Sequence, residues 1–281
     1  MLERSFIHLH GVGEATERAI WDSGIETWDD FARVEGHVPG IGPAKRAAVI
    51  MGLDESRAAL ARGDARFFGS AFKSSDSWRL AADFRDRLAF VDIETTGMGP
   101  GSAVTVVGVY AGGTARAFVR GIDMDELPGA LEPYDIYVTY NGRCFDVPFL
   151  INEFGRRIAP AAQIDLRFVL AAVGLKGGLK GVERAVGIAR PGDLAELDGW
   201  DAVRLWYEHL DGHPESLRTL VRYNIEDILN LEPLLEIAIR RHIEGRDLPF
   251  TLPCKDEGRA AERAEAGEQA LVKLGRSSGL W

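Results

Sequence analysis

The sequence predicts an α/β protein in which helices flank a mixed sheet, preceded by a small all-α domain. Three observations lead to this prediction. From residue 86 onward, short apolar segments rich in β-branched residues alternate with helical patterns. Residues 1–57 have helical periodicity instead, interrupted by glycine-containing turns. The chain has 281 residues, of which 46% are hydrophobic and 27% charged, enough for one large and one small globular domain.

The composition also indicates where the protein works. The sequence begins without a basic region followed by an apolar stretch, and no apolar run reaches the ~18–20 residues of a membrane span. Only Cys144 and Cys254 occur, which excludes a disulfide framework. We therefore expect a cytoplasmic protein with no membrane partner. The net charge of −10 argues against a broad nucleic-acid-binding surface, but it permits an enzyme that meets phosphates through bound metal ions.

Residues 1–57 are expected to form the helical domain. The stretch 10–13 (HGVG) precedes one helical pattern, and the stretch 38–45, which contains PGIGPAK, precedes another. The second stretch resembles the turn of helix-hairpin-helix modules, in which glycines let backbone N–H groups approach a DNA phosphate. Residues 1–60 nevertheless carry six basic and ten acidic side chains, a net charge of 6 − 10 = −4. Two roles therefore stay open, binding of duplex DNA and docking to a protein partner.

Two segments flank the α/β domain, which we predict over residues 86–250. Residues 58–85 contain glycines and a polar run, which is typical of a connecting segment. The aromatic residues Phe67, Phe68, Phe72 and Trp78 would be costly to leave in water, so we expect this segment to pack along the α/β domain. Residues 251–281 are rich in Ala, Glu, Arg and Gly without a stable apolar stripe, and we expect a mobile or weakly helical tail.

Within the α/β domain, the first three strands should form an antiparallel meander. They are predicted over residues 88–93, 103–111 and 115–119, and a tight Gly-Gly-Thr turn joins the last two. A short helix (124–131), a strand (136–140), a longer helix (146–156) and an extended segment around residue 164 follow. The remainder is mostly helical. Its last helix begins near Pro214 and should kink or end at Pro233.

The first predicted strand ends in the sequence FVDIETTG, which carries two acids. Side chains alternate along a strand, so Asp92 and Glu94 project from the same face, roughly 6.5 Å apart along the backbone. Two carboxylates on one face of a buried strand repel each other and are costly to desolvate. A divalent cation between them removes both costs, and oxygen ligands suit Mg²⁺ or Mn²⁺. The alternative is a strand that ends in a polar turn closed by Gly97, with its acids in water.

Two further acidic motifs follow. Asp146 stands at the start of a predicted helix, just after the end of a strand and two residues before Pro148, where it could also serve as a helix cap. Tyr223 and Asp227 lie four residues apart in the last predicted helix, on one flank of its apolar stripe. The alternative for Tyr223 is an ordinary half-buried aromatic residue. In order, the three motifs are D-x-E, N-x₃-F-D and Y-x₃-D.

This order of motifs resembles the DEDD 3′–5′ exonuclease superfamily, in the subgroup whose third motif carries tyrosine, and it implies a ribonuclease H-like domain. The stretches 77–80, 139–143 and 174–180 are similar to YprB-type predicted exonucleases. The resemblance implies a site with two Mg²⁺ or Mn²⁺ ions in which Tyr223 orients the attacking water. The four carboxylates that would hold the ions are Asp92, Glu94, Asp146 and Asp227.

The implied activity is hydrolysis of single-stranded or frayed DNA or RNA from its 3′ end by a two-metal mechanism, releasing nucleoside 5′-monophosphates. The resemblance also implies substrate contacts by Thr95, Thr96 and the backbone near Gly97. Asn141 and Phe145 would position the strand turn and a terminal base.

Three further points of interpretation concern Lys180, Asp165 and the competing functions. Lys180 follows two glycines at the start of a predicted helix and is a candidate phosphate contact, against the alternative of a solvated surface lysine. Asp165 follows a strand and is expected to cap a helix. The competing functions are a catalytically silent nuclease-fold protein that binds nucleic acid or acts as an adaptor, and a structure-selective endonuclease of the same fold.

Overall fold

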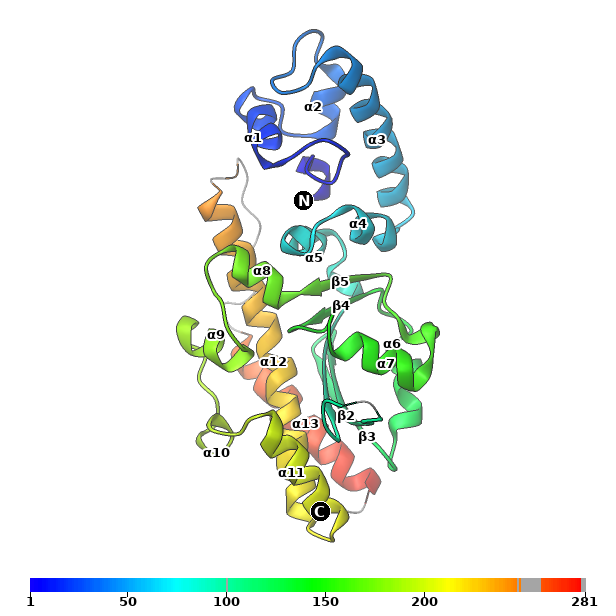
Figure 1. The fold of residues 1–281 in the computed structure, drawn as a ribbon, viewed down its shortest axis with the longest axis vertical. Helices are drawn as coiled ribbons and strands as arrows, with labels where there is room; N and C mark the ends of the chain where they lie inside the picture. Colours follow the sequence, from blue (N-terminus) through cyan, green and yellow to red (C-terminus); the bar gives the residue numbers. More distant parts are fainter. Residues whose placement is uncertain (100, 247, 249–258, 279–281) are drawn as a thin grey trace.

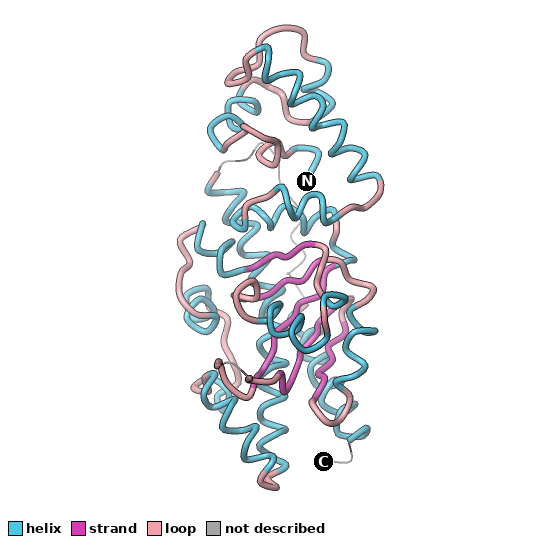
Figure 2. The backbone as a smooth tube through the Cα atoms, turned by 45° about the vertical axis from the view of Figure 1, so that its right-hand side comes forward, coloured by secondary structure: helices cyan, strands magenta, loops and turns pink. Residues whose placement is uncertain are grey.

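The computed structural model describes residues 1–99, 101–246, 248 and 259–278. The molecule is elongated, with a helical domain at one end and a five-stranded sheet, covered by helices on both faces, in the larger part (Figures 1 and 2). No described helix has the length and apolar composition needed to cross a membrane.

The sheet has the strand order β3-β2-β1-β4-β5 and confirms the predicted mixed architecture. Its first three strands form the predicted antiparallel meander, and the last two run parallel to β1. The strand bounds are β1 (Leu88–Thr95), β2 (Val104–Ala111), β3 (Thr114–Val119), β4 (Ile136–Thr139) and β5 (Ala162–Asp165).

Helices cover the two faces of the sheet. Side chains of Ala89, Val91 and Ile93 on β1 belong to a cluster with apolar residues of α6 and α7. Phe90 points to the opposite face and joins the larger core that contains α12. Because directions alternate, Asp92 and Glu94 also face the α12 side. The helix bounds are α6 (Leu127–Leu131), α7 (Asp146–Phe154), α8 (Leu166–Ala172), α9 (Leu179–Val186), α10 (Gly192–Ala195), α11 (Gly199–Leu210), α12 (Pro214–Gly245) and α13 (Ala260–Ser278).

The N-terminal part is helical, as the periodicity predicts. Gly13 and Gly42 are the residues that precede α1 and α3, so each glycine-containing turn leads into a helix. The helix α3 extends past residue 57, so the predicted domain boundary lies inside a helix. The helix bounds are α1 (Glu14–Asp22), α2 (Trp28–Arg33), α3 (Pro43–Ala61), α4 (Ala65–Ala71) and α5 (Leu80–Asp83).

The segment between the helical domain and the sheet is folded and buried. Arg79 is fully enclosed and donates hydrogen bonds to both carboxylate oxygens of Glu17 on α1, at 2.9 and 2.8 Å. The indole of Trp78 stacks on the His242 ring of α12, with centroids 5.0 Å apart. Apolar residues of both parts belong to one continuous core.

The structure decides between alternatives that the sequence left open for the C-terminal part. First, α12 continues through Pro233, so the helix does not end there. Proline removes one hydrogen bond and crowds the preceding turn. The helix is nevertheless buried on nearly every side between residues 220 and 239. Its tertiary packing therefore outweighs the local cost.

Second, residues 260–278 of the segment that was expected to be mobile or weakly helical form the helix α13. Its buried side chains Ala266, Ala270 and Leu274 repeat every four residues and pack against the sheet beside α12. Small residues of this kind give a weak hydrophobic pattern in the sequence, but they let a helix approach its neighbours closely. Residues 251–258 and 279–281 lie outside the described residues.

Candidate metal centre

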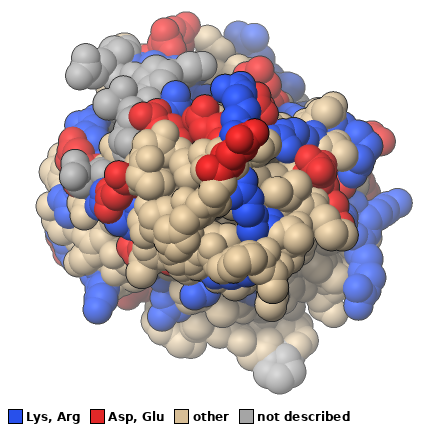
Figure 3. Space-filling model, turned by 90° about the horizontal axis from the view of Figure 1, so that it is seen from above, with Lys and Arg blue, Asp and Glu red and all other residues tan. Residues whose placement is uncertain are grey.

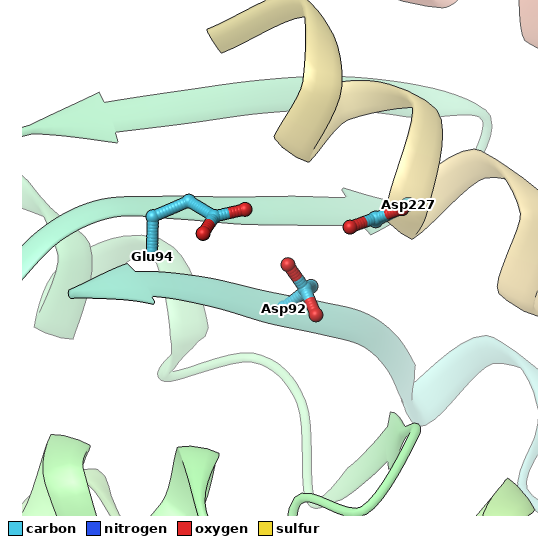
Figure 4. Close-up of side chains that lie close together, drawn as sticks. All are labelled: Asp92, Glu94 and Asp227. Atoms are coloured by element: carbon cyan, nitrogen blue, oxygen red, sulfur yellow. The ribbon is translucent and has the colours of Figure 1, made fainter. Parts of the chain in front are cut away.

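Three of the predicted acids converge at the centre of the molecule. Asp92 and Glu94 project from β1, and Asp227 reaches them from α12, as Figure 4 shows. Each of the three offers a carboxylate oxygen, and these oxygens lie within 4.8 Å of one another. Asp227 and Glu94 are only 5% and 8% exposed, so the acids do not end in open water. Strand periodicity and the Y-x₃-D spacing therefore identified residues that the fold brings together.

A glycine on β2 allows α12 to come close enough for this contact. Gly108 pairs with Asp92 in the sheet, and a Cβ at Gly108 would lie 2.4 Å from Asn224 Oδ1. Asn224, one residue after Tyr223, is fully buried. Its Nδ2 donates hydrogen bonds to Asp92 Oδ2 at 2.9 Å and to the Asp92 carbonyl oxygen at 3.2 Å. Neither residue has a predicted role, although a glycine inside the apolar strand VTVVGVYA indicates close approach of another segment to the backbone.

Asp146 lies in the same pocket, at the start of α7. Phe145 is the N-cap of α7 and Asp146 is the first residue of the helix, so Asp146 does not occupy the N-cap position. It is 3% exposed, and its Oδ1 has no hydrogen-bond partner among the described residues. Asp165 does cap α8, as predicted. It also accepts hydrogen bonds from the backbone N–H groups of Asn141 and Arg143 at 2.8 and 3.0 Å, which fixes the loop that carries Asp146.

The acids line a pocket of about 430 Å³. Tyr223, Thr95, Asn141 and Phe145 also line it, in agreement with their predicted proximity to the site. The lining also includes residues for which the sequence predicted no role, among them Met98, Tyr140, Asp198 and Trp200.

Three predicted substrate contacts lie outside the pocket lining. Thr96 accepts a hydrogen bond from the Ala103 N–H and so stabilises the connection between β1 and β2, in which Gly97 also lies. Lys180 is not a solvated surface lysine. Its Nζ lies 4.5 Å from the centroid of the Tyr223 ring and has no hydrogen-bond partner among the described residues.

Burial and mutual repulsion control the protonation of the acids. Burial raises the pKa of Asp92 and of Glu94 well above the usual range, and repulsion by Asp227 and Asp146 raises both further. Burial also raises the pKa of Asp146 to about 7 and the pKa of Asp227 to about 6. Such a group of desolvated carboxylates is stabilised by a positive charge placed between them.

The side chain of Arg190 already contacts the cluster with a positive charge, although no sequence motif indicates this contact. The guanidinium of Arg190, in the segment between α9 and α10, places Nη2 2.5 Å from Asp227 Oδ1. The same guanidinium binds Glu183 of α9 through two hydrogen bonds of 2.6 Å. Burial lowers the pKa of Lys180, and the nearby charge of Arg190 lowers it further.

The donor set fits a hard divalent cation, because Asp92, Glu94 and Asp227 offer clustered carboxylate oxygens. Asp146, in the same pocket, adds an oxygen that has no hydrogen-bond partner among the described residues. Neither the comparison with curated proteins nor the comparison with solved structures found a match. A family model described as the RNase H superfamily matches residues 89–239, more than half of the chain, from β1 through most of α12. We conclude that the chain belongs to the RNase H superfamily, whose nucleases typically use divalent metal ions.

Proposed function

We propose that this protein is a metal-dependent 3′–5′ exonuclease that acts on single-stranded or frayed nucleic acid and releases nucleoside 5′-monophosphates. The observation that carries the proposal is the convergence of Asp92, Glu94 and Asp227 within 4.8 Å, in a pocket that Asp146 and Tyr223 also line. Superfamily membership supports hydrolysis of nucleic acid. The order of the motifs supports the exonuclease subgroup with tyrosine.

The four carboxylates would hold two Mg²⁺ or Mn²⁺ ions, which would supply an activated water and stabilise the departing 3′-oxygen. The side chains around the site position the metal-ligand candidates. Asn224 holds Asp92 through two hydrogen bonds. Burial, together with repulsion by the acids, raises the pKa of Tyr223, so its phenol keeps its proton at neutral pH. Tyr223 is therefore suited to orient a water molecule by hydrogen bonding and not to act as a general base.

The pocket lining supports an unpaired terminal nucleotide as the substrate. Trp200 and Met98 are 69% and 73% exposed at the pocket, and Phe145 adds a third apolar surface. Aromatic faces stack on bases with little sequence preference. Lys180, beside Tyr223, is placed to add positive charge near a terminal phosphate. Neither DNA nor RNA is favoured by these contacts.

For the N-terminal domain we keep two proposals. The glycine turn before α3 supports a contact with a phosphate of duplex DNA. Figure 3, which views the molecule from the end that carries these helices, shows acidic and basic side chains interspersed instead of a continuous basic surface. This distribution, with the net charge of −4 over residues 1–60, supports a protein partner.

The proposal is tested with end-labelled oligonucleotides that carry a free or a blocked 3′ end, in Mn²⁺, in Mg²⁺ and in EDTA. We expect stepwise shortening of the free end only, dependent on the metal. Asp227→Ala should reduce the rate by at least about 100-fold, since losing even a partner of a metal ligand costs 10–100-fold. Asp211→Ala, which removes an exposed acid after α11, serves as the control. Cleavage of blocked or circular substrates would identify an endonuclease instead.

A second candidate function has a specific observation in its favour. The ion pair between Arg190 and Asp227 satisfies part of the negative charge that a metal ion would neutralise. This supports a catalytically silent protein that binds nucleic acid or acts as an adaptor. Binding of oligonucleotides without cleavage in either metal, equal in wild type and Asp227→Ala, would establish this alternative and reject the exonuclease.

A further inference from the structure

Arg190 connects the acidic cluster to an acid that does not belong to it. Its side chain is only 4% exposed, and it lies between Glu183, which is 1% exposed, and Asp227. The planar guanidinium binds both oxygens of Glu183 at 2.6 Å. Nη2 also lies 2.5 Å from Asp227 Oδ1. One buried side chain therefore joins α9 to the metal-ligand candidate on α12.

The side chain of Arg190 is held in place by Glu183, which is itself held by a residue of α12. Asn230, one turn after Asp227 on α12, donates a hydrogen bond from Nδ2 to Glu183 Oε1 at 3.1 Å. Two parallel N–H···O bonds to a carboxylate restrict an arginine in both direction and plane. Glu183 and Asn230 thus hold the guanidinium against Asp227. This arrangement differs from a surface ion pair, which loses much of its strength to solvent and side-chain entropy.

The charges around Asp227 show what Arg190 does there. Asp92 and Glu94 of β1 cluster with Asp227, and Arg190, which is held by Glu183 of α9, contacts Asp227 directly. Arginine stays protonated at every ordinary pH, so its charge is permanent. Without a metal ion, this charge offsets the mutual repulsion of the buried carboxylates. With a metal ion present, the same charge repels the ion, since both lie against Asp227.

We propose that Arg190 is a built-in counterion of the acidic cluster. It is a positioning residue that keeps Asp227 in place when no ion is bound and weakens the affinity of the site for divalent cations. The repulsion among the carboxylates in the metal-free site is thereby reduced, so metal ions can leave and rebind while the acids keep their positions. This inference rests on the proposed function, because it takes Asp227 as a metal ligand.

The test measures Mn²⁺ binding in the absence of nucleic acid, by electron paramagnetic resonance or calorimetry. Replacing Arg190 alone would leave Glu183 as a buried, uncompensated carboxylate, so the informative variant is Arg190→Gln combined with Glu183→Gln. We expect it to bind Mn²⁺ about threefold to tenfold more tightly than wild type, because the positive charge that it removes contacts Asp227, whereas the negative charge that it removes lies behind Arg190 and acts on the ion more weakly. Arg190→Lys keeps the charge but loses the two parallel hydrogen bonds to Glu183, so its Mn²⁺ affinity should lie between those of wild type and the double variant. Arg184→Gln removes an exposed charge from the same helix and serves as the control.

A second measurement uses thermal unfolding. In EDTA the double variant should melt at a lower temperature than wild type, because Asp227 has lost its counterion. Added Mn²⁺ should raise its melting temperature more than that of wild type, since tighter binding to the native state gives more stabilisation. A lower melting temperature without this larger Mn²⁺ response would show a merely structural ion pair and overturn the proposal.

The outcomes separate this inference from the proposed function. Equal or weaker Mn²⁺ binding in the double variant would overturn the counterion role alone. Absence of Mn²⁺ binding in every variant and in wild type would overturn the metal site and the inference together. Tighter binding in the double variant, without cleavage of any oligonucleotide by wild type, would establish the counterion role and reject the exonuclease.

Discussion

Gly108 on β2 and Asn224 on α12 are in such close contact that a Cβ on the glycine would lie 2.4 Å from Asn224 Oδ1. The same Cβ would lie 2.8 Å from a methyl carbon of Ile228. Both neighbours are fully buried, so neither can move aside easily. The position of α12 over β1, and with it the approach of Asp227 to Asp92, depends on the missing side chain.

We therefore expect Gly108→Ala to displace α12. The overpacking should lower the free energy of unfolding by about 1–3 kcal/mol and reduce nuclease activity disproportionately. Chemical denaturation and the oligonucleotide assay measure the two effects. Gly129→Ala on α6, where a Cβ meets nothing within 4 Å, is the matched control. Wild-type activity in a stable Gly108→Ala protein would contradict this dependence.

Asn224→Ala should weaken Mn²⁺ binding by about 10–100-fold, the usual effect of losing a group that orients a metal ligand. The variant removes the hydrogen bonds that hold the Asp92 carboxylate and carbonyl. Titration with Mn²⁺ gives the affinity, and Arg218→Ala on the exposed side of the same helix should leave it unchanged. Unaltered Mn²⁺ binding in Asn224→Ala would exclude this orienting role.

Tyr223→Phe separates orientation from proton transfer. Because its pKa is raised, we expect the phenol to contribute a hydrogen bond and no proton abstraction. The rate constant for cleavage should fall by about tenfold, less than the 10²–10⁴-fold typical of a lost acid–base group. Mn²⁺ affinity and the shape of the pH–rate profile should stay the same. A profile that loses its dependence on pH in the variant would identify Tyr223 as a titrating group.

Stability without metal should increase as the pH falls. The pKa values of Asp146 and Asp227, about 7 and about 6 in the native state, exceed the ordinary value of 3.8. Between about pH 4 and 7 the native state therefore holds protons that the unfolded state has lost, and the contribution of these acids to stability falls as the pH rises. In EDTA at pH 8, Asp146→Asn should melt at a higher temperature than wild type, and the difference should shrink toward pH 5. A constant difference would show that Asp146 does not titrate in this range.

Protons and metal ions compete for the same oxygens. Mn²⁺ affinity should consequently increase as the pH rises through 6 and 7. Calorimetry at several pH values in buffers of different ionisation enthalpy would detect the released protons. Binding without proton release at pH 6 would contradict the raised pKa values.

The helix α13 gives a prediction for the part of the chain expected to be mobile. Ala270 is 5% exposed against the core, whereas Val272 is 52% exposed on the same helix. Ala270→Glu should lower the melting temperature by several degrees, because it buries a charge without a partner. Val272→Glu should have almost no effect. Equal melting temperatures for the two variants would show that α13 does not contribute to the folded core in solution.

The sequence predicts those features that depend on local periodicity. Alternation along β1 placed Asp92 and Glu94 on one face, and the four-residue spacing placed Tyr223 and Asp227 together on α12. The order of strand and helix patterns was enough to predict the mixed sheet. Asp165 was recognised as a helix cap, because capping depends on residues directly adjacent in the chain.

Features that depend on distant contacts could not be predicted in this way. Arg190 stands in an irregular segment, and only the folded chain shows that its guanidinium contacts Asp227. Asn224 acquires its role from a glycine on another strand. Proline inside a helix usually kinks or breaks it. At Pro233 the burial of α12 overrides that preference, and the helix continues. The stripe of small residues in α13 becomes visible as a packing surface only beside β3.

The stacking of Trp78 on His242 determines how the protein can be divided for experiments. A fragment that begins at residue 86 would leave His242 without the indole of Trp78, and it would leave Arg246 without its 2.7 Å ion pair to Asp76. A fragment that ends before residue 86 would lose the apolar side chains of the α/β domain that share a core with its own helices. The smallest unit suited to biochemical reconstitution is therefore the undivided polypeptide.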